Sequence, residues 1–517
     1  MKLGDVMAVV AGAATLPPGQ QGREVLEIVH DSRKAKDGSL FVAVRGFHSD
    51  GHQFIPHAVQ QGAAAVIAEA WNGPQTDTPV ILVPDSRIAL ARLAAAFYGH
   101  PSRRLKLIGI TGTNGKTTTS YLVKSIIEAA GHVSGLIGTI DYRIGDRVYP
   151  APNTTPESLD LQRLLAEMVE NGAGFCVMEV SSHALALKRT EECAFEAAAF
   201  TNLTQDHLDF HGDMDSYFHA KLGLFTGLSP KASAVINLDD ARAPEIIRAT
   251  KAKVITTGLS ERADIRPSGD IGHEITGLSF PVATPSGTLM ARSPLMGKHN
   301  IYNILSAIGI GTALGFTLDH IARGIENMKA VPGRMEKVDE GQSFSVLVDY
   351  AHTEDALVRL LEAVREVAPK RVITLFGCGG DRDRTKRPKM GKAALKGSDI
   401  VVVTSDNPRS EDPEAIIREV EAGMAEAGVR MLSSGAHPEA ARGKKPYFVV
   451  PHRGEAVVTA IRLAAPGDVV VLAGKGHEDY QILGDRKIHF DDREAAREAI
   501  RKRMGEGVRS QKSGVRS

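Results

Sequence analysis

One stretch of this chain passes from a buried strand into a helix through a glycine-rich turn. The strand is the apolar run LKLIGI at Leu105–Ile110, and the turn is TGTNG at Thr111–Gly115. From Thr117 onward, apolar residues recur at helical spacing until Gly131. A strand that feeds directly into a helix is the unit of a parallel sheet, so this stretch predicts an α/β fold.

The same turn predicts a phosphate-binding loop. Backbone N–H groups at the start of a helix attract anions. Lys116 would reach the β- and γ-phosphates of a nucleotide, and the hydroxyl of Thr117 would bind Mg²⁺. The first loop glycine is Gly112, whereas the general phosphate loop has it two positions earlier, where this chain has Ile110. The loop is therefore a shortened variant, and the alternative is an ordinary strand–turn–helix corner.

The length of 517 residues suggests about three domains. We expect an N-terminal domain over residues 1–104, a central domain with a mostly parallel sheet over 105–332 and a C-terminal domain over 333–505. In the last of these, four apolar runs alternate with helical patterns, which predicts a doubly wound, Rossmann-like sheet. Residues 506–517 are polar and rich in Gly and Ser, so we expect a disordered tail there.

The composition excludes several classes of protein. Lys and Arg together number 62, as do Asp and Glu, so net charge gives no reason to expect nucleic acid or a membrane surface as a partner. No apolar run is long enough to span a bilayer. The three cysteines show neither a metal spacing nor an even disulfide framework, which favours a reducing cytoplasm. The N-terminus is interpreted as the start of a helix rather than a signal peptide.

A second apolar run, FCVMEVSSH at Phe175–His183, brings a carboxylate to the end of a predicted strand. Phosphate-loop proteins take a Mg²⁺ ligand from the end of a neighbouring strand, and Glu179 could supply it. The same carboxylate could equally cap the helix that follows.

The next segment is crowded with side chains that can bind metals, although their spacing matches no zinc pattern. Either a metal site or a solvated loop would explain the cluster of Asp206, His207, Asp209, His211, Asp213 and Asp215. Lys221 follows among apolar and aromatic residues. It is either a surface lysine or a buried lysine whose lowered pKa makes it reactive.

Six motifs in order resemble those of the Mur ligase family, the ATP-dependent enzymes that build the stem peptide of peptidoglycan. One such motif would be weak support, but six spread over nearly the whole chain are specific. They are GTNGKTT at Gly112–Thr118, EVSSHAL at Glu179–Leu185, TNLTQDHLDFHG at Thr201–Gly212, GKHNIYN at Gly297–Asn303, PGRME at Pro332–Glu336 and VDYAHTEDAL at Val348–Leu357.

The resemblance implies a site for ATP and two Mg²⁺ ions. Glu179 and His207 would be Mg²⁺ ligands, together with Thr117. Lys221 would be carbamylated by CO₂ and would act as an anionic ligand of the second ion. Arg334 would neutralise charge near the transferred phosphoryl group, so the catalytic set is Lys116, Lys221, His207 and Arg334. The implied ATP contacts are Gly112, Thr113, Asn114, Gly115, Lys116, Thr117, Thr118, Asn300, Arg334 and Asp349.

The N-terminal domain resembles the UDP-binding module of the family. The resemblance implies UDP-MurNAc-L-Ala-D-Glu as one substrate. The family often has glutamine two residues before Arg189, whereas this chain has Leu187. The implied contacts are Ser32, Phe47, His48, Ser49, Asn153, Thr154, Thr155, Ser181 and Arg189.

Four loops of the C-terminal region carry arginines beside acids. At the carboxyl ends of parallel strands, where such sheets bind ligands, they suit a zwitterion with more than one carboxylate. For any one loop, ordinary surface turn residues are the alternative. The resemblance implies meso-diaminopimelate as the second substrate, because Arg409 of the DNPR motif would pair with the carboxylate that lysine lacks. The implied contacts are Arg382, Asp406, Asn407, Pro408, Arg409, Gly474 and Glu478.

The resemblance therefore implies a cytoplasmic, monomeric ligase that forms an amide bond through an acyl phosphate. A relative that adds L-lysine is one alternative. A folylpolyglutamate synthase would share the phosphate loop but would not explain DNPR or the UDP-module motifs. A phosphate-loop switch that is not a ligase is a third alternative, although GTPases of that class usually carry an N-K-x-D motif and this chain has none.

Overall fold

The computed structural model describes residues 1–10, 16, 19–46, 49–145, 147–274, 277–328, 331–367, 370–425, 428–433, 435–441 and 444–513. The chain forms two compact units. One consists of Met1–Ser268, Val282–Leu289 and Tyr302–Asn327, and the other of Gly269–Pro281, Met290–Ile301 and Met328–Ser517. Three α/β sheets give the chain its three-domain organisation, with an N-terminal, a central and a C-terminal sheet. The domain boundaries expected at residues 104 and 332 stay predictions.

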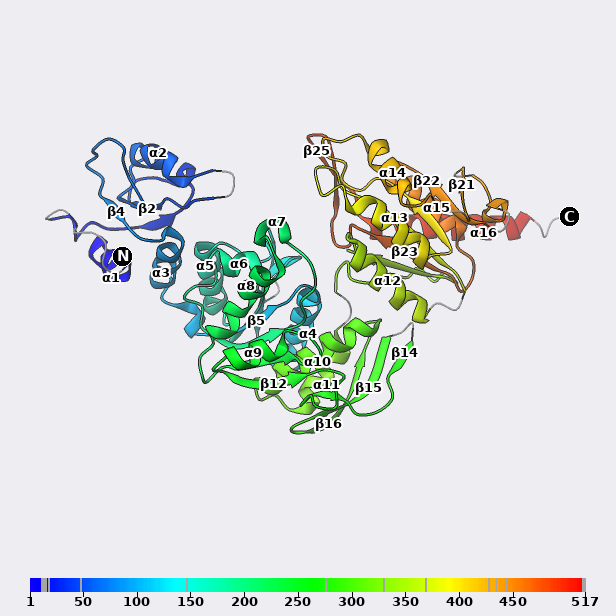
Figure 1. Ribbon diagram of the computed structural model, residues 1–517, viewed down its shortest axis with the longest axis horizontal. Helices are drawn as coiled ribbons and strands as arrows, with labels where there is room; N and C mark the ends of the chain where they lie inside the picture. The colour runs from blue at the N-terminus through cyan, green and yellow to red at the C-terminus, as the bar shows by residue number, and fades with distance from the viewer. Residues whose placement is uncertain are drawn as a thin grey trace. The chain divides into compact units, whose positions relative to one another are not determined.

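The N-terminal sheet has four parallel strands in the order β1-β2-β3-β4. Helices α1 and α3 cover one face and α2 covers the other, because each face of the sheet buries its own apolar cluster (Figure 1). The elements are β1 (Glu27–Val29), β2 (Ser39–Val42), β3 (Ala65–Ala68), β4 (Val80–Leu82), α1 (Leu3–Val10), α2 (Ile55–Gln60), α3 (Ser86–Phe97) and the 3₁₀ turns η1 (Ser32–Lys34), η2 (Gly51–Phe54) and η3 (Pro101–Arg103).

The central sheet has eight strands in the order β12-β11-β10-β5-β9-β6-β7-β8. Only β7 and β8 run antiparallel to their neighbours, so the prediction of a mostly parallel sheet is confirmed. The strands are β5 (Lys106–Thr111), β6 (Ser134–Ile137), β7 (Asp141–Ile144), β8 (Arg147–Pro150), β9 (Phe175–Glu179), β10 (Phe195–Phe200), β11 (Ser233–Asn237) and β12 (Lys253–Thr257). The helices are α4 (Lys116–Ala129), α5 (Ser158–Glu170), α6 (Ser182–Ala186), α7 (Leu208–His211), α8 (Met214–Thr226), α9 (Ala243–Ala249), α10 (Lys298–Ala313) and α11 (Leu318–Asn327).

A small antiparallel sheet separates the central strands from α10 in the sequence. In it, β15 pairs with each of the other three strands. The strands are β13 (Arg266–Pro267), β14 (Gly272–Glu274), β15 (Gly277–Thr284) and β16 (Gly287–Ser293).

The C-terminal sheet has the order β17-β18-β23-β19-β20-β22-β21, in which only β17 is antiparallel. The four predicted apolar runs form β19, β20, β22 and β23, so the doubly wound sheet is confirmed, while β17, β18 and β21 were not predicted. The strands are β17 (Glu336–Val338), β18 (Ser345–Asp349), β19 (Val372–Phe376), β20 (Ile400–Val403), β21 (Val429–Leu432), β22 (Lys445–Val449), β23 (Val469–Ala473), and the hairpin β24 (Tyr480–Leu483) and β25 (Arg486–His489). The helices are α12 (Glu354–Val367), α13 (Lys386–Gly397), α14 (Pro413–Ala422), α15 (Arg453–Leu463), α16 (Asp492–Ser513) and the 3₁₀ turn η4 (Pro438–Ala441).

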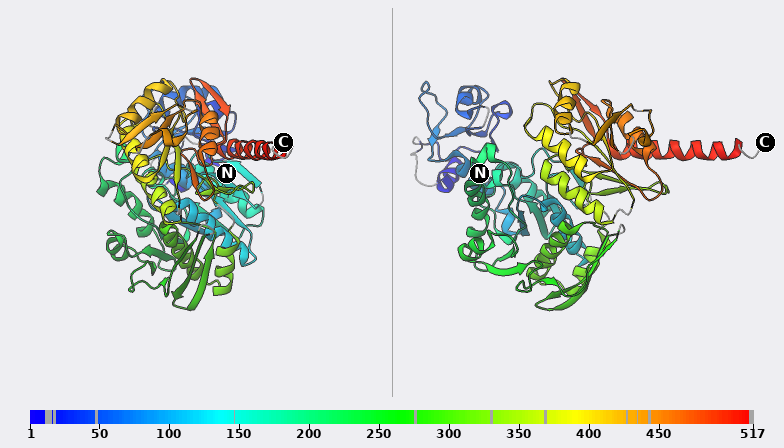
Figure 2. Two further views of the ribbon diagram at one scale, coloured as in Figure 1. Left: turned by 90° about the vertical axis from the view of Figure 1, so that its right-hand side faces the viewer. Right: turned by 45° about the vertical axis from the view of Figure 1, so that its right-hand side comes forward.

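Helix α16 differs from its expectation at the C-terminal end. It continues through Ser513 and projects beyond the rest of its domain (Figure 2). A disordered tail was expected from residue 506, whereas the structure continues the helix through Gly505 and Gly507, two residues that disfavour helix. Residues 514–517 lie outside the described residues. No helix within the described part of the chain is both long and apolar enough to cross a membrane.

The start of α16 is attached to the sheet by a buried ion pair. Arg453, the first residue of α15, donates to both carboxylate oxygens of Asp492 at 2.8 and 2.7 Å and to the carbonyl oxygen of Ala473 at 3.0 Å. Both side chains of the pair are 0% exposed.

Replacing Arg453 by methionine is expected to lower the free energy of unfolding by about 3–5 kcal/mol, because a buried carboxylate loses its partner. Denaturant unfolding followed by circular dichroism measures this change. Arg462→Met, an exposed position on the same helix, is the control and should cost little. A loss below about 1 kcal/mol for Arg453→Met would contradict the expectation.

Candidate active site

The predicted phosphate loop lies at the carboxyl end of β5, in the middle of the central sheet, and leads into α4 at Lys116. The strand–loop–helix prediction is confirmed. Two glycines have backbone conformations that favour glycine, with φ of 148° at Gly112 and 87° at Gly115. A Cβ atom at Gly112 would lie 1.9 Å from the hydroxyl of Thr201, and one at Gly115 would lie 2.2 Å from Oδ1 of Asn303. The loop therefore needs both glycines.

The neighbouring strand β10 supports this loop. Thr113 donates its backbone N–H to the carbonyl oxygen of Asn202, and Asn114 donates to the Asn202 side chain at 3.0 Å. Thr201 donates its hydroxyl to the carbonyl oxygen of Asn114 at 2.6 Å. The shape of the loop thus depends on residues about 90 positions further along the chain.

Two lysines converge on the carbonyl oxygen of Gly112. Lys116 donates to it at 2.9 Å and Lys221, from α8, at 3.0 Å. Lys221 is only 1% exposed, so the surface-lysine interpretation is wrong. Burial, reinforced by the positive charge of Lys116, holds the pKa of Lys221 well below its ordinary value. This shift favours the neutral, nucleophilic form of the amine.

Glu179 lies at the end of β9, the strand next to β5, and is 0% exposed. Its carboxylate accepts hydrogen bonds from the hydroxyls of Thr117 and Thr139, both at 3.0 Å, and from the backbone N–H of Thr139 at 2.9 Å. The cap of the following helix is instead the side chain of Ser181. Hydroxyl and carboxylate oxygens are hard donors that suit Mg²⁺, so this pair fits the ion that the sequence implied.

His207 begins α7 with φ of 53°. Its ring lies against those of His183 and Tyr217, with centroids 4.8 and 6.1 Å away. Burial lowers the pKa of His207, although the neighbouring Asp206 acts in the opposite direction, so the neutral imidazole is favoured.

The rest of the acidic and histidine cluster does not converge. Asp213 caps α8 by accepting the backbone N–H of Ser216, and Asp215 pairs with Arg242. His211 hydrogen-bonds to Ser182. Among the described residues, no group of three or more His, Cys, Asp or Glu side chains is arranged to hold a metal ion. The six-residue metal site stays a prediction, since Asp213, Asp215 and His211 are engaged in a helix cap, an ion pair and a hydrogen bond.

The predicted peptide-contact residues gather beside Glu179. Thr155 donates its hydroxyl to the carbonyl oxygen of Glu179 at 2.8 Å and accepts the backbone N–H of Ser181 at 3.1 Å. Arg189 donates to the carbonyl oxygen of Thr155 at 3.0 Å. A hydrogen bond of 3.0 Å joins the hydroxyls of Thr154 and Thr139. Asn153 precedes this pair and is exposed.

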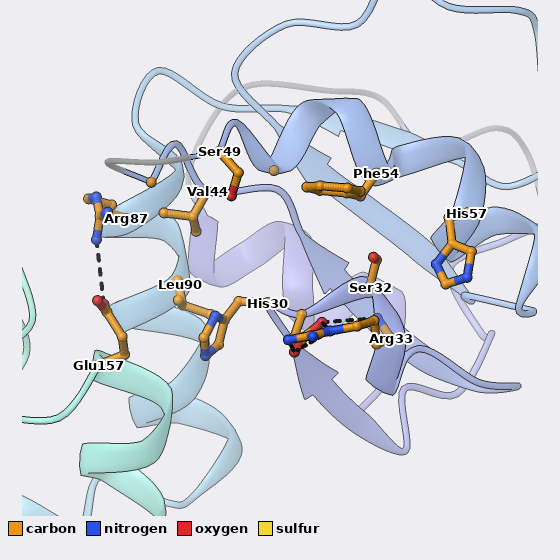
Figure 3. Close-up of a pocket in the computed structure, with 13 residues that line it drawn as sticks. His30, Ser32, Arg33, Val44, Ser49, Phe54, His57, Arg87, Leu90 and Glu157 are labelled. Carbon is orange, nitrogen blue, oxygen red and sulfur yellow. Dashed lines mark hydrogen bonds and ion pairs between the residues drawn. The ribbon is translucent and has the colours of Figure 1, made fainter. Parts of the chain in front are cut away.

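The N-terminal domain contributes a cavity of about 740 Å³. Ser32, Ser49, Phe54 and His57 are among the residues that line it (Figure 3). Phe47 and His48 lie outside the described residues. The volume is large enough for one part of a nucleotide-sized ligand.

At the edge of this cavity, Glu157 pairs with two arginines. Its carboxylate is 3.4 Å from Arg87 of α3 and 2.6 Å from Arg189 (Figure 3 shows the first pair). Glu157 lies two residues after the predicted contact Thr155, but its pairing depends on Arg87 and Arg189, which are distant in the sequence.

Three predicted nucleotide contacts belong to the second unit. Asn300 is buried and donates to the carbonyl oxygen of Met296 at 2.7 Å. The guanidinium of Arg334 lies over the ring of Tyr350, and its buried Nε has no hydrogen-bond partner among the described residues. Asp349 accepts the backbone N–H groups of residues 335 and 351, both at 2.8 Å, and burial raises its pKa. An unpaired donor in this turn suits an anionic ligand.

The predicted amino-acid pocket lies at the carboxyl ends of the adjacent strands β23, β19 and β20. Asn407 donates its amide to Glu478 at 3.0 Å, and Arg409 donates to the carbonyl oxygen of Gly380 at 2.8 Å. Asp406 and Pro408, which flank Asn407 in the sequence, are buried. Gly474, with φ of 112°, ends β23. Most of the predicted set is thus brought together.

Arg382 is the exception in this set. It is exposed, and it donates a hydrogen bond to the carbonyl oxygen of Asp381 at 2.9 Å.

Three sequence models of one family match the chain in order. They are described as "Mur ligase family, catalytic domain" at residues 24–98, "Mur ligase middle domain" at residues 110–311 and "Mur ligase, glutamate ligase domain" at residues 333–476. Together they cover well over half of the sequence.

The chain belongs to the Mur ligase family.

Curated relatives match this Mur ligase over its length. The chain is similar to the UDP-N-acetylmuramoyl-L-alanyl-D-glutamate–2,6-diaminopimelate ligase of Geobacter metallireducens, with 46% identity over 98% of this chain and 100% of the relative. The ligase of the same name from Geobacillus thermodenitrificans is 48% identical over 93% and 96%. A solved structure of a ligase with that name has a TM-score of 0.70 at 31% identity and covers 98% of this chain and 99% of its own.

Sequence reasoning missed one fully buried arginine of this Mur ligase. Arg387 is 0% exposed and pairs with Glu411 at 2.8 Å and Glu419 at 2.9 Å. It also donates to the carbonyl oxygen of Gly379, and it lowers the pKa of Glu411 to about 2. Arg387 thereby joins the loops that carry Arg382 and Arg409. No local pattern distinguishes Arg387 from the other charged residues of the segment DRDRTKRP at Asp381–Pro388.

Proposed function

We propose that this Mur ligase joins meso-diaminopimelate to the D-glutamate γ-carboxylate of UDP-MurNAc-L-Ala-D-Glu and converts ATP to ADP and phosphate. The observation that carries the proposal is the full-length similarity, at 46 and 48% identity, to ligases named for this reaction. The enzyme would act as a monomer in the cytoplasm, in the synthesis of peptidoglycan precursors. The DNPR motif supports diaminopimelate rather than L-lysine as the substrate.

The phosphate loop would hold ATP through backbone N–H groups and Lys116. Thr117 and Glu179 would bind one Mg²⁺, with His207 and a carbamate on Lys221 available for a second. Bound Mg²⁺ would offset the negative charges of the phosphates and of the acceptor carboxylate. The proposed ATP contacts are Gly112, Thr113, Asn114, Gly115, Lys116, Thr117, Thr118, Asn300, Arg334 and Asp349.

The carbamate on Lys221 is supported by the burial of its amine. A neutral amine adds to the carbon of CO₂, and loss of a proton then leaves an anionic carbamate. Its oxygens are ligands that Mg²⁺ prefers, unlike the nitrogen of a protonated lysine. Burial lowers the pKa of Lys221, which favours the neutral form that this addition requires.

The nucleotide-sugar peptide would bind along the first unit. Ser32, Ser49 and the cavity around them would hold the UDP end, and Phe47 and His48 are further proposed contacts of that end. Arg189 would pair with a carboxylate of the peptide, because a guanidinium fork matches that group. The remaining proposed contacts are Asn153, Thr154, Thr155 and Ser181.

The chemistry needs ATP because a free carboxylate does not react with an amine. The γ-carboxylate oxygen of D-glutamate attacks the γ-phosphorus, ADP leaves and an acyl phosphate forms. Lys116 and Arg334 would stabilise the charge on the transferred group. The amine of diaminopimelate then attacks the carbonyl carbon, a tetrahedral intermediate forms, and phosphate leaves as the amide closes.

The amino-acid pocket would hold diaminopimelate through charges of both signs. Arg409 and Arg382 would pair with carboxylates, and Asp406 and Glu478 with an ammonium group. Asn407, Pro408 and Gly474 would complete the pocket.

Phosphate release tests this function. With ATP, Mg²⁺ and UDP-MurNAc-L-Ala-D-Glu present, we expect release with meso-diaminopimelate and at least about tenfold less with L-lysine, since lysine leaves Arg409 without its partner. Equal release would contradict the choice of substrate. With no amine and with hydroxylamine added, the acyl phosphate should be trapped as a hydroxamate. A folylpolyglutamate synthase would release phosphate with neither amine.

A further inference from the structure

A fully buried lysine pairs with two of the predicted amino-acid contacts, Asp406 and Glu478, and no role has been given to it so far. Lys475 follows Gly474 at the end of β23 and is 0% exposed. Its ammonium group is 3.1 Å from Oε2 of Glu478 and 3.6 Å from Oδ1 of Asp406. It also lies 5.4 Å from the centre of the Tyr480 ring. Lysine is almost never fully buried unless it is paired, so this position is specialised.

Lys475 and the DNPR loop together fix Glu478. The oxygen Oε2 of Glu478 accepts hydrogen bonds from Lys475 at 3.1 Å and from the amide of Asn407 at 3.0 Å. The other end of that amide, Oδ1 of Asn407, accepts the backbone N–H of Ile482 at 3.0 Å. Two donors from two different loops therefore determine the direction of one carboxylate.

The carboxylate of Asp406 is less well fixed by hydrogen bonds than that of Glu478. Its Oδ1 is buried and has no hydrogen-bond partner among the described residues, since the 3.6 Å to Lys475 is an ion-pair distance. The buried Arg453 is already paired with Asp492. One ammonium group thus serves two carboxylates, which leaves the cluster with a surplus negative charge and an open acceptor. A second ammonium group, from a ligand, is the chemistry that would complete it.

We propose that Lys475 is a positioning residue for the amino-acid substrate: it holds Glu478 and Asp406 so that both face an ammonium group of a diamino acid. This inference rests on the proposed function and adds how one end of the substrate is recognised. Without Lys475, the two carboxylates repel each other, and Glu478 loses one of the two donors that orient it. Lys475 acts through these carboxylates and need not touch the substrate.

Lys475→Met tests this role, because methionine keeps the apolar stem and removes the charge. We expect the KM for meso-diaminopimelate to rise about 30-fold or more, with much smaller changes in the KM values for ATP and the nucleotide-sugar peptide. The matched control is Lys487→Met. Lys487 also lies over the Tyr480 ring, at 3.8 Å, but is exposed, and its loss should change the KM for diaminopimelate by less than about twofold.

A double-mutant cycle with Glu478→Gln separates positioning from a general structural effect. If Lys475 acts through Glu478, adding Lys475→Met to Glu478→Gln should raise the KM by less than about threefold further, because the two effects are not independent. Effects that multiply fully, or a normal KM for Lys475→Met, would overturn the proposal. If Lys475→Met does not fold, the same KM measurement is made with Lys475→Gln, which removes the charge but keeps a hydrogen-bond donor.

Trapping with hydroxylamine in the absence of diaminopimelate distinguishes a failure of the Lys475 proposal from a failure of the proposed function. A hydroxamate formed by the Lys475 variants shows that the remainder of the enzyme is folded and active. No hydroxamate from the unmodified protein would count against the proposed function itself, and not against the role of Lys475.

Discussion

Replacing Lys221 by alanine is expected to lower kcat by about 10²–10³-fold or more while the protein stays folded. The lysine is buried beside the phosphate loop, and its amine donates to the carbonyl oxygen of Gly112 at 3.0 Å. Burial lowers the pKa of that amine and so favours its neutral form, the form that can add CO₂. The variant would lose the carbamate and, with it, an anionic ligand for the second Mg²⁺.

Three measurements check this expectation. The ligase assay gives kcat, circular dichroism reports folding, and the intact mass of the unmodified protein in bicarbonate should show the addition of one CO₂. Formate or acetate should restore part of the activity of Lys221→Ala, because a small carboxylate can occupy the vacated space. Lys231→Ala, at an exposed lysine beyond the end of α8, is the control. Near-normal turnover of Lys221→Ala would exclude the carbamate role.

Replacing Arg409 by alanine is expected to raise the KM for meso-diaminopimelate about 10²-fold, with a smaller change in kcat. Arg409 has φ of 53°, and its guanidinium is held by the carbonyl oxygen of Gly380 at 2.8 Å. In return, Gly380 donates its N–H to the carbonyl oxygen of Asn407 at 2.9 Å. The arginine is thus presented by two loops that support each other, and its removal leaves a substrate carboxylate without its partner.

Steady-state kinetics with diaminopimelate and with L-lysine give the result. The preference for diaminopimelate should fall in Arg409→Ala, because lysine lacks the second carboxylate with which Arg409 would pair. Arg418→Ala, an exposed arginine on α14 with surface ion pairs to Asp412 and Glu414, should leave both KM values unchanged. An unchanged KM for diaminopimelate in Arg409→Ala would remove this arginine from the pocket.

The parts of the fold that local patterns specify were predictable. The step from Leu105–Ile110 into the glycine loop and α4 is confirmed, since strand, turn and helix propensities are encoded within a few residues. The four apolar runs of the C-terminal region are strands for the same reason. The short strands β17 and β21 were missed, because three or four residues carry too little periodicity to be recognised.

The sequence by itself determined the phosphate loop, the kind of sheet and the family. Only the tertiary structure decided which side chains are buried and what they contact. Lys221 could have been a surface residue, and its burial against Gly112 depends on a chain separation of 109 residues. Asp213 and Asp215 could have been metal ligands, but they cap a helix and pair with Arg242. Burial, pKa and pairing depend on neighbours brought together by folding, and local sequence does not encode them.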